Sequence, residues 1–138
     1  MFLSGLQRDK HCIDEIIKDY GSADPGVEIF LDRPLCDLAF LLKQSAGVLS
    51  VDTGILHLAR AMNVPVVALF GPSNPDFTGC VGPGEYVQLR NDFPCGPCNY
   101  STEYRYEDKK YCLDGKSPAC MKSITPQQVV AALEGILN

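Results

Sequence analysis

The sequence lacks both an excess of positive charge and a long hydrophobic run. Its 12 Lys and Arg residues are outnumbered by 17 Asp and Glu residues, which gives a formal net charge of −5. Without a basic stripe, such a chain does not attract a nucleic-acid backbone over a broad surface, so nucleic acid is an unfavourable partner. No apolar run approaches the roughly 18 residues that a membrane-spanning helix needs, which argues against a transmembrane protein.

The N-terminal residues MFLSGLQRDKHC also lack the basic segment and the long apolar segment of a secretory signal. The cysteines number seven, and an odd number does not indicate a disulfide framework. These absences favour a cytoplasmic location. At 138 residues, the chain is long enough for one domain and too short for two ordinary ones.

Predicted strands and helices alternate along the first two thirds of the chain. Apolar periodicity predicts helices over 8–20, 34–46 and 53–62, and strands over 1–5, 27–31, 47–51, 66–70 and 86–90. This order implies βαβ units, and therefore an α/β fold with a parallel sheet. Because the first strand begins abruptly, we expect the chain to be a piece of a longer protein.

The C-terminal third has a different character. A cysteine-rich loop is predicted at about 92–122, and a helix at about 125–137. Thr125 is the expected N-cap of this helix, with Pro126 at its first position and Gln128 completing a capping box. We expect residues 1–138 to form a single domain.

Ligands of open parallel sheets bind beyond the carboxyl ends of the strands, so the residues that follow each strand are the candidates for a site. Every strand-to-helix connection needs a turn, however, and for the first two segments a structural role is as well supported as a binding role. The four segments are Ser4-Gly5, Asp32-Arg33, Asp52-Thr53-Gly54 and Gly71-Pro72-Ser73.

The third segment carries the clearest chemistry. Asp52 or Thr53 can act as N-cap of the following helix, and Gly54 has no Cβ to keep a ligand from the free amides of the first turn. This arrangement predicts a seat for a phosphate group. His57, one turn into the helix, could add a hydrogen bond or a positive charge, although a histidine near a helix start more often has a structural role.

Asp-Thr-Gly also occurs in aspartic proteases, where two carboxylates share a proton. This sequence has one copy, placed on a strand-to-helix turn, so a protease would require a homodimer. We therefore favour the phosphate-binding interpretation.

Read as one unit, VDTGILHLARAMNVPVVALFGPSNP (51–75) resembles the signature of glycosyltransferase family 9, the ADP-heptose:lipopolysaccharide heptosyltransferases. That family has an Asp-Ser/Thr-Gly-x-x-His helix start, then a Pro-led apolar strand, then Phe-Gly-Pro-Thr/Ser-x-Pro. The resemblance extends back through LDRPLCDLAFLLKQSAGVLS and forward to CGPC and ACMKSITPQQVV, so it covers nearly the whole chain.

The resemblance implies the C-terminal half of a GT-B fold, a Rossmann-like three-layer domain that holds the nucleotide-sugar. The implied reaction is inverting transfer of heptose or a related sugar from ADP to a lipopolysaccharide-core acceptor, with no catalytic metal. The N-terminal GT-B domain, absent here, would bring the acceptor site and the general base. No catalytic residue is then expected in this chain, which would be inactive alone, in the cytoplasm or at the inner membrane's surface.

The resemblance also implies roles for single residues. The amides of Thr53 and Gly54, with His57 nearby, would hold the diphosphate, while Asp52 fixes the turn or contacts the sugar. Further substrate-binding residues are implied by position: Arg33 beside the nucleotide base, Asp9 at the ribose, and Gly71, Pro72 and Ser73 in the far wall of the donor pocket.

Four cysteines in the C-terminal third could form a structural zinc site. Four thiolates complete a tetrahedral zinc shell, and the expected ligands are Cys95, Cys98, Cys112 and Cys120. The later pair is spaced more widely than in common zinc ribbons, so reduced thiols or an occasional disulfide remain alternatives.

Two other functions also stay open: a stand-alone nucleotide or phosphate-binding module without catalysis, and a zinc-stabilised interaction domain.

Overall fold

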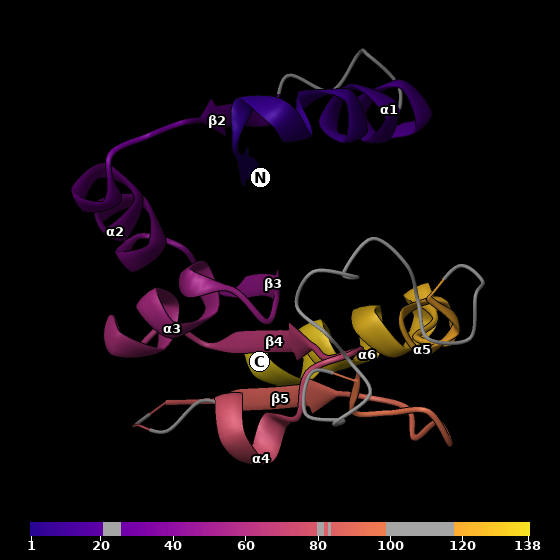
Figure 1. Ribbon diagram of the computed structural model, residues 1–138. Helices are drawn as coiled ribbons and strands as arrows, with labels where there is room; N and C mark the ends of the chain where they lie inside the picture. Colours follow the sequence, from indigo (N-terminus) through magenta and orange to yellow (C-terminus); the bar gives the residue numbers. More distant parts are fainter. Residues whose placement is uncertain (21–25, 80–81, 83, 99–117) are drawn as a thin grey trace. The chain divides into compact units, whose positions relative to one another are not determined.

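The computed structural model describes residues 1–20, 26–79, 82, 84–98 and 118–138. Helices alternate with parallel strands, so the predicted α/β class is confirmed (Figure 1). The chain groups into two compact units, Met1–Leu38 and Ala39–Asn138, and each is described by itself. A single domain over residues 1–138 stays a prediction.

The first unit contains a two-stranded parallel sheet. Strand β1 (Phe2–Gly5) pairs with β2 (Glu28–Leu31), from Phe2 opposite Glu28 to Gly5 opposite Leu31. Between them lie a short 3₁₀ helix (Gln7–Asp9) and α1 (Lys10–Tyr20), whose Ile13 is buried. The next helix, α2 (Leu35–Lys43), begins in this unit and ends in the second.

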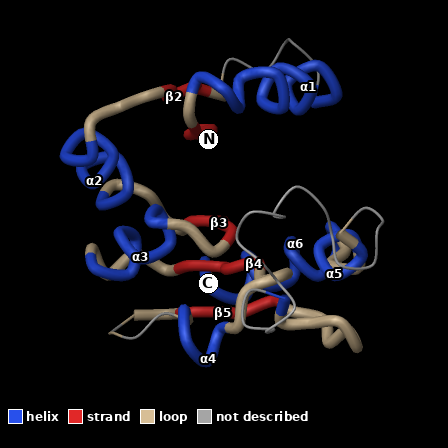
Figure 2. Tube along the Cα trace, in the orientation of Figure 1, coloured by secondary structure: helices blue, strands red, loops and turns tan. Residues whose placement is uncertain are grey.

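The second unit is built on a three-stranded parallel sheet in the order β3-β4-β5 (Figure 2). Helix α3 packs on β3 and β4, and α6 packs on β4 and β5. The bounds are β3 (Val48–Val51), α3 (Gly54–Ala61), β4 (Val66–Leu69), β5 (Tyr86–Leu89) and α6 (Pro126–Leu137).

Strand β4 is the centre of this unit because it has a hydrogen-bonded strand on both sides. Val66, Val67, Ala68 and Phe70 are completely buried. Burying a side chain the size of Val or Phe contributes about 1.5–3 kcal/mol. The run of buried apolar residues that predicted this strand is therefore also the main stabilising element of the second unit.

Helix α3 ends as its sequence predicts. Asn63 adopts the left-handed conformation (φ 58°) that often terminates helices, and the amide of Val64 donates to the carbonyl of Ala59 over 3.0 Å. Pro65 follows and has no amide to continue the helix. The chain then enters β4, so α3 connects two strands that are paired with each other.

Two short helices, α4 (Pro75–Thr78) and α5 (Ala119–Lys122), were not predicted. A helix of four residues is too short to show an apolar period, so these helices cannot be predicted from periodicity. The C-terminal helix α6 is confirmed with its cap: Thr125 accepts from the amide of Gln128, and the Gln128 side chain accepts from the amide of Thr125. In the part of the chain described, every helix is too short or too polar to cross a lipid bilayer.

Candidate functional site at the carboxyl ends of β3 and β4

The third and fourth post-strand segments lie at the same edge of one sheet. Strands β3 and β4 are parallel neighbours, and their last paired residues are Val51 and Leu69. Asp52-Thr53-Gly54 and Gly71-Pro72-Ser73 therefore leave the sheet side by side. This is the edge at which parallel sheets bind ligands.

The N-terminus of α3 is open. Thr53 has the extended conformation of an N-cap, but its hydroxyl donates back to the carbonyl of Val51 over 3.3 Å and does not cap the helix. No described side chain accepts a hydrogen bond from the amides of Gly54 or Ile55. A Cβ built on Gly54 would meet nothing within 4 Å, and Gly54 is exposed. Uncapped amides at an accessible helix start attract an anion.

Asp52 accepts no hydrogen bond from these amides, and its two oxygens lie near two other groups. Its Oδ2 accepts from the hydroxyl of Thr78 over 2.8 Å, and its Oδ1 lies 3.7 Å from Nε2 of His57. The Asp52 side chain is 17% exposed, while that of His57 is 50% exposed. The carboxylate is thus mostly enclosed, whereas the imidazole reaches solvent one turn into α3.

The segment after β4 has mixed exposure. Pro72 is exposed, while Ser73 is buried at 5% exposure. A Cβ on Gly71 would lie 2.5 Å from Sδ of Met121 and 3.3 Å from Sγ of Cys120. Glycine at this position therefore allows α5 to approach the segment closely, a packing role that the sequence did not reveal.

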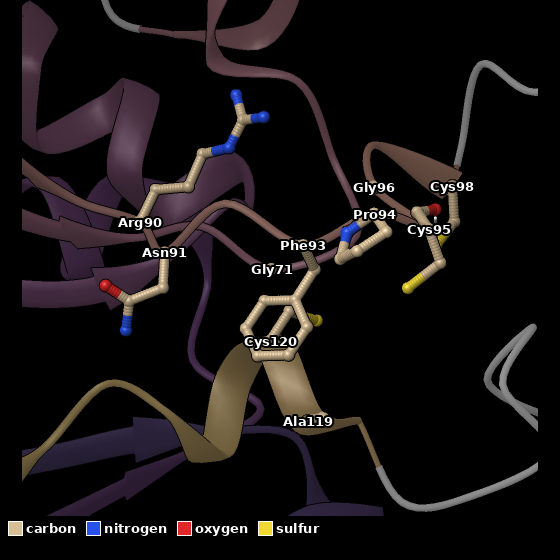
Figure 3. Close-up of a pocket in the computed structure, with 10 residues that line it drawn as sticks. All are labelled: Gly71, Arg90, Asn91, Phe93, Pro94, Cys95, Gly96, Cys98, Ala119 and Cys120. Carbon is tan, nitrogen blue, oxygen red and sulfur yellow. Dashed lines mark hydrogen bonds between the residues drawn. The ribbon is translucent and has the colours of Figure 1, made fainter.

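Gly71 also lines a cavity of about 190 Å³ beyond β4 and β5. Figure 3 shows that its lining residues come from three segments: the end of β4, the stretch after β5, and α5. The polar lining consists of Arg90, which is 3.3 Å from exposed Asp92, and Asn91, which donates to the hydroxyl of Ser123 over 2.8 Å. Its polar side chains are therefore already paired.

Three of the predicted zinc ligands also line this cavity: Cys95, Cys98 and Cys120. The thiol of Cys98 donates to the carbonyl of Cys95 over 3.3 Å (Figure 3). Cys112, the fourth, lies outside the described residues. Among the side chains described, no three of His, Cys, Asp or Glu are arranged to hold a metal ion. The zinc site stays a prediction.

Asp9 and Arg33 lie in the first unit, where both have local partners. Oδ2 of Asp9 accepts from the amide of Leu6 over 3.0 Å, closing the start of the 3₁₀ helix. The guanidinium of Arg33 lies 5.6 Å from the ring centre of Phe30. The neighbouring Asp32, at φ 49°, accepts from the amide of Gln7 over 3.1 Å. These contacts account for Asp9 and Asp32 as structural residues and leave nucleotide binding by Asp9 and Arg33 as a prediction.

Two residues that the sequence did not single out organise the second unit. Thr78 holds Asp52, and no pattern around it could have shown this contact. Arg60 on α3 is 4% exposed and donates to the carbonyls of Gly82 and Glu85 over 2.6 and 3.2 Å. A charged residue on a mostly apolar helix is a signal that could have indicated such a buried role.

Comparison with known proteins shows which family the chain resembles. Residues 2–107 match the family described as glycosyltransferase family 9 (heptosyltransferase). The chain is 40% identical over 124 residues to lipopolysaccharide heptosyltransferase 1 of Pseudomonas aeruginosa, covering 85% of this chain and 35% of that protein. It is 47% identical over 47 residues to lipopolysaccharide heptosyltransferase 2 of Escherichia coli, covering 34% of this chain and 14% of the relative.

Solved structures show the same similarity. ADP-heptose lps heptosyltransferase II of Escherichia coli superposes with a TM-score of 0.73 at 25% identity, over 99% of this chain and 35% of that one. A family 9 glycosyl transferase of Veillonella parvula shares the fold, with a TM-score of 0.68 over 99% of this chain and 36% of that one. The match covers most of this chain but only about a third of the length of each of these proteins. The chain belongs to glycosyltransferase family 9.

Proposed function

We propose that this chain is the donor-binding part of a family 9 glycosyltransferase. The reaction is transfer of heptose, or a related sugar, from an ADP-sugar to a lipopolysaccharide-core acceptor, with inversion and without a catalytic metal. The observation that supports it best is the uncapped start of α3, where Gly54 leaves the first amides accessible. Family membership supports the assignment to sugar transfer.

In this proposal the diphosphate of the donor binds at the amides of Gly54 and Ile55. The sequence predicted the amides of Thr53 and Gly54, but Thr53 is the N-cap residue and α3 begins at Gly54. Breaking the glycosidic bond places additional negative charge on the departing diphosphate. Amides that are already oriented stabilise this charge more in the transition state than in the bound donor, and this difference accelerates the reaction. His57 contributes a hydrogen bond or a positive charge from the next turn.

The remaining roles follow the resemblance to the family. Arg33 lies beside the nucleotide base, Asp9 reaches the ribose, and Gly71-Pro72-Ser73 borders the donor. The general base and the acceptor site belong to a further domain, outside the residues of this chain. The enzyme works on the cytoplasmic side, at the surface of the inner membrane.

Calorimetric titration of the 138-residue chain with ADP, AMP and adenosine tests the proposal. ADP should bind most tightly, since it presents both phosphates to the helix start, and adenosine most weakly. Equal affinity for ADP and adenosine, or no heat at millimolar ADP with a folded chain, would contradict it. Whether the module is catalytic or only binds nucleotide is decided by supplying any domain encoded upstream of Met1 and measuring acceptor-dependent release of ADP.

A further inference from the structure

Asp52 is the side chain most able to block the helix start at which the proposed function places the diphosphate. An Asp commonly accepts a hydrogen bond from the amide two residues further on, which for Asp52 is the amide of Gly54. In that arrangement the carboxylate of Asp52 would itself occupy the position at the helix start where an anion would bind. In the structure Asp52 makes no such bond, and its two oxygens face Thr78 and His57 instead.

We infer that Thr78 is a positioning residue that keeps the carboxylate of Asp52 away from the amides of Gly54 and Ile55, so that the anion seat stays open. The inference rests on the proposed function for the identity of the anion. The contact that carries it is the 2.8 Å hydrogen bond from the Thr78 hydroxyl to Oδ2 of Asp52. A hydrogen bond to a carboxylate is stronger than one between neutral groups.

Thr78 is itself held in place by α4. The amide of Asp76 donates to the side chain of Asn74 over 3.1 Å, and the first residue of the helix, Pro75, is buried. The carbonyl of Asn74 is a second acceptor within reach of the Thr78 hydroxyl, at 3.1 Å. The hydroxyl has a single hydrogen, and the shorter contact to a charged oxygen favours Asp52.

His57 does not replace Thr78 in this role. Its Nε2 is 3.7 Å from Oδ1 of Asp52, beyond hydrogen-bond distance, and half of its side chain is exposed. Thr78 is the partner at hydrogen-bond distance. If Thr78 lacked its hydroxyl, the nearest uncapped donors to Asp52 in the sequence would be the amides of Gly54 and Ile55, which the diphosphate is proposed to use.

The experiment compares Thr78→Val with Thr78→Ser, which retains the hydroxyl, in the 138-residue chain. The first readout needs no nucleotide: the hydrogen-exchange rates of the Gly54 and Ile55 amides, measured by NMR. In Thr78→Val we expect these amides to exchange several-fold more slowly, because Asp52 accepts from them, and in Thr78→Ser at the wild-type rate. Adding Asp52→Ala to Thr78→Val should restore fast exchange, since no carboxylate is left to cap the helix.

The second readout is ADP affinity. We expect Thr78→Val to weaken ADP binding about tenfold and Thr78→Ser to bind ADP within about twofold of wild type. In an Asp52→Ala background, Thr78→Val should have no further effect on ADP affinity, because the two residues act through one contact. Unchanged exchange at Gly54 and Ile55 in Thr78→Val would overturn the inference, as would an equal loss of affinity with and without Asp52. A wild-type chain that does not bind ADP would contradict the proposed function, while the exchange rates would still decide the role of Thr78.

Discussion

Nε2 of His57 lies 3.7 Å from Oδ1 of Asp52, so the one histidine on α3 stands beside an enclosed carboxylate and next to an open helix start. Under the proposed function, His57 would contact the bound diphosphate from this half-exposed position.

Replacing His57 by Ala should weaken ADP binding by about 1–2 kcal/mol, as is typical for the loss of a hydrogen bond to a charged group. That corresponds to roughly a 5- to 30-fold higher Kd in calorimetry. The matched control is His11→Ala, which removes the other histidine of the chain, an exposed residue of the first unit. Equal effects of the two substitutions would argue against a specific role for His57.

Adding a side chain at Gly54 should block the site without unfolding the protein. A Cβ at Gly54 meets no atom within 4 Å, so the substitution Gly54→Val leaves the packing intact and places its methyl groups over the first amides. We expect ADP affinity to fall at least about tenfold, equivalent to about 1.4 kcal/mol. Gly135→Val in α6 is the control, because a Cβ there is equally unhindered. Circular dichroism should show wild-type helix content in both variants.

Gly71 should be sensitive to substitution for a packing reason. Gly71→Val would overlap Met121 and should destabilise the protein by about 1–3 kcal/mol, the usual cost of overpacking. Urea unfolding measures this loss. Shortening the opposing side chain in the double variant Gly71→Val/Met121→Ala should recover part of it, and additive losses would show that the two residues do not meet.

Arg60 should matter for stability and not for nucleotide binding. Its guanidinium donates to the carbonyls of Gly82 and Glu85 and lies 5.3 Å from the ring centre of Tyr86. Arg60→Met would leave the carbonyl of Gly82 without this donor, while the carbonyl of Glu85 would still accept from the amide of Val66 over 3.0 Å. We expect the free energy of unfolding to fall by about 1–3 kcal/mol. Arg60→Lys should rescue little, because an ammonium cannot reproduce the planar fork. ADP affinity measured below the unfolding transition should stay at the wild-type value.

The zinc prediction is tested by the metal content of the chain purified under reducing conditions. Four thiolates would hold one zinc ion per chain, and Cys120→Ser should lower that occupancy. Cys36→Ser, at an exposed cysteine outside the predicted set, should not. Absence of bound zinc in the wild-type chain would leave the thiols with a packing or redox role.

The sequence predicted the elements whose signal is local. The apolar run of β4, the Asn63-Pro65 end of α3 and the capping box at Thr125 are each decided by a few adjacent residues, and each is confirmed. Gly54 leaves the first amides accessible, as the sequence predicted, but neither Asp52 nor Thr53 caps the helix with its side chain. The phosphate-binding role itself remains a proposal.

Contacts between distant residues could not be predicted in this way. The bond from Thr78 to Asp52 spans 26 positions, and that from Arg60 to Glu85 spans 25. Both depend on how the connections after β3 and β4 fold back at the edges of the sheet. The arginine on the mostly apolar helix α3 could indicate that Arg60 is buried, but no periodicity or motif shows which distant group it contacts.

The central claim is that the first amides of α3 bind the diphosphate of a nucleotide-sugar, and it is tested most directly by ¹H–¹⁵N NMR of the 138-residue chain during titration with ADP. The account predicts saturable shifts that are largest at Gly54 and Ile55 and that disappear in Gly54→Val. Shifts centred elsewhere in a folded chain, or no shift at millimolar ADP, would contradict it.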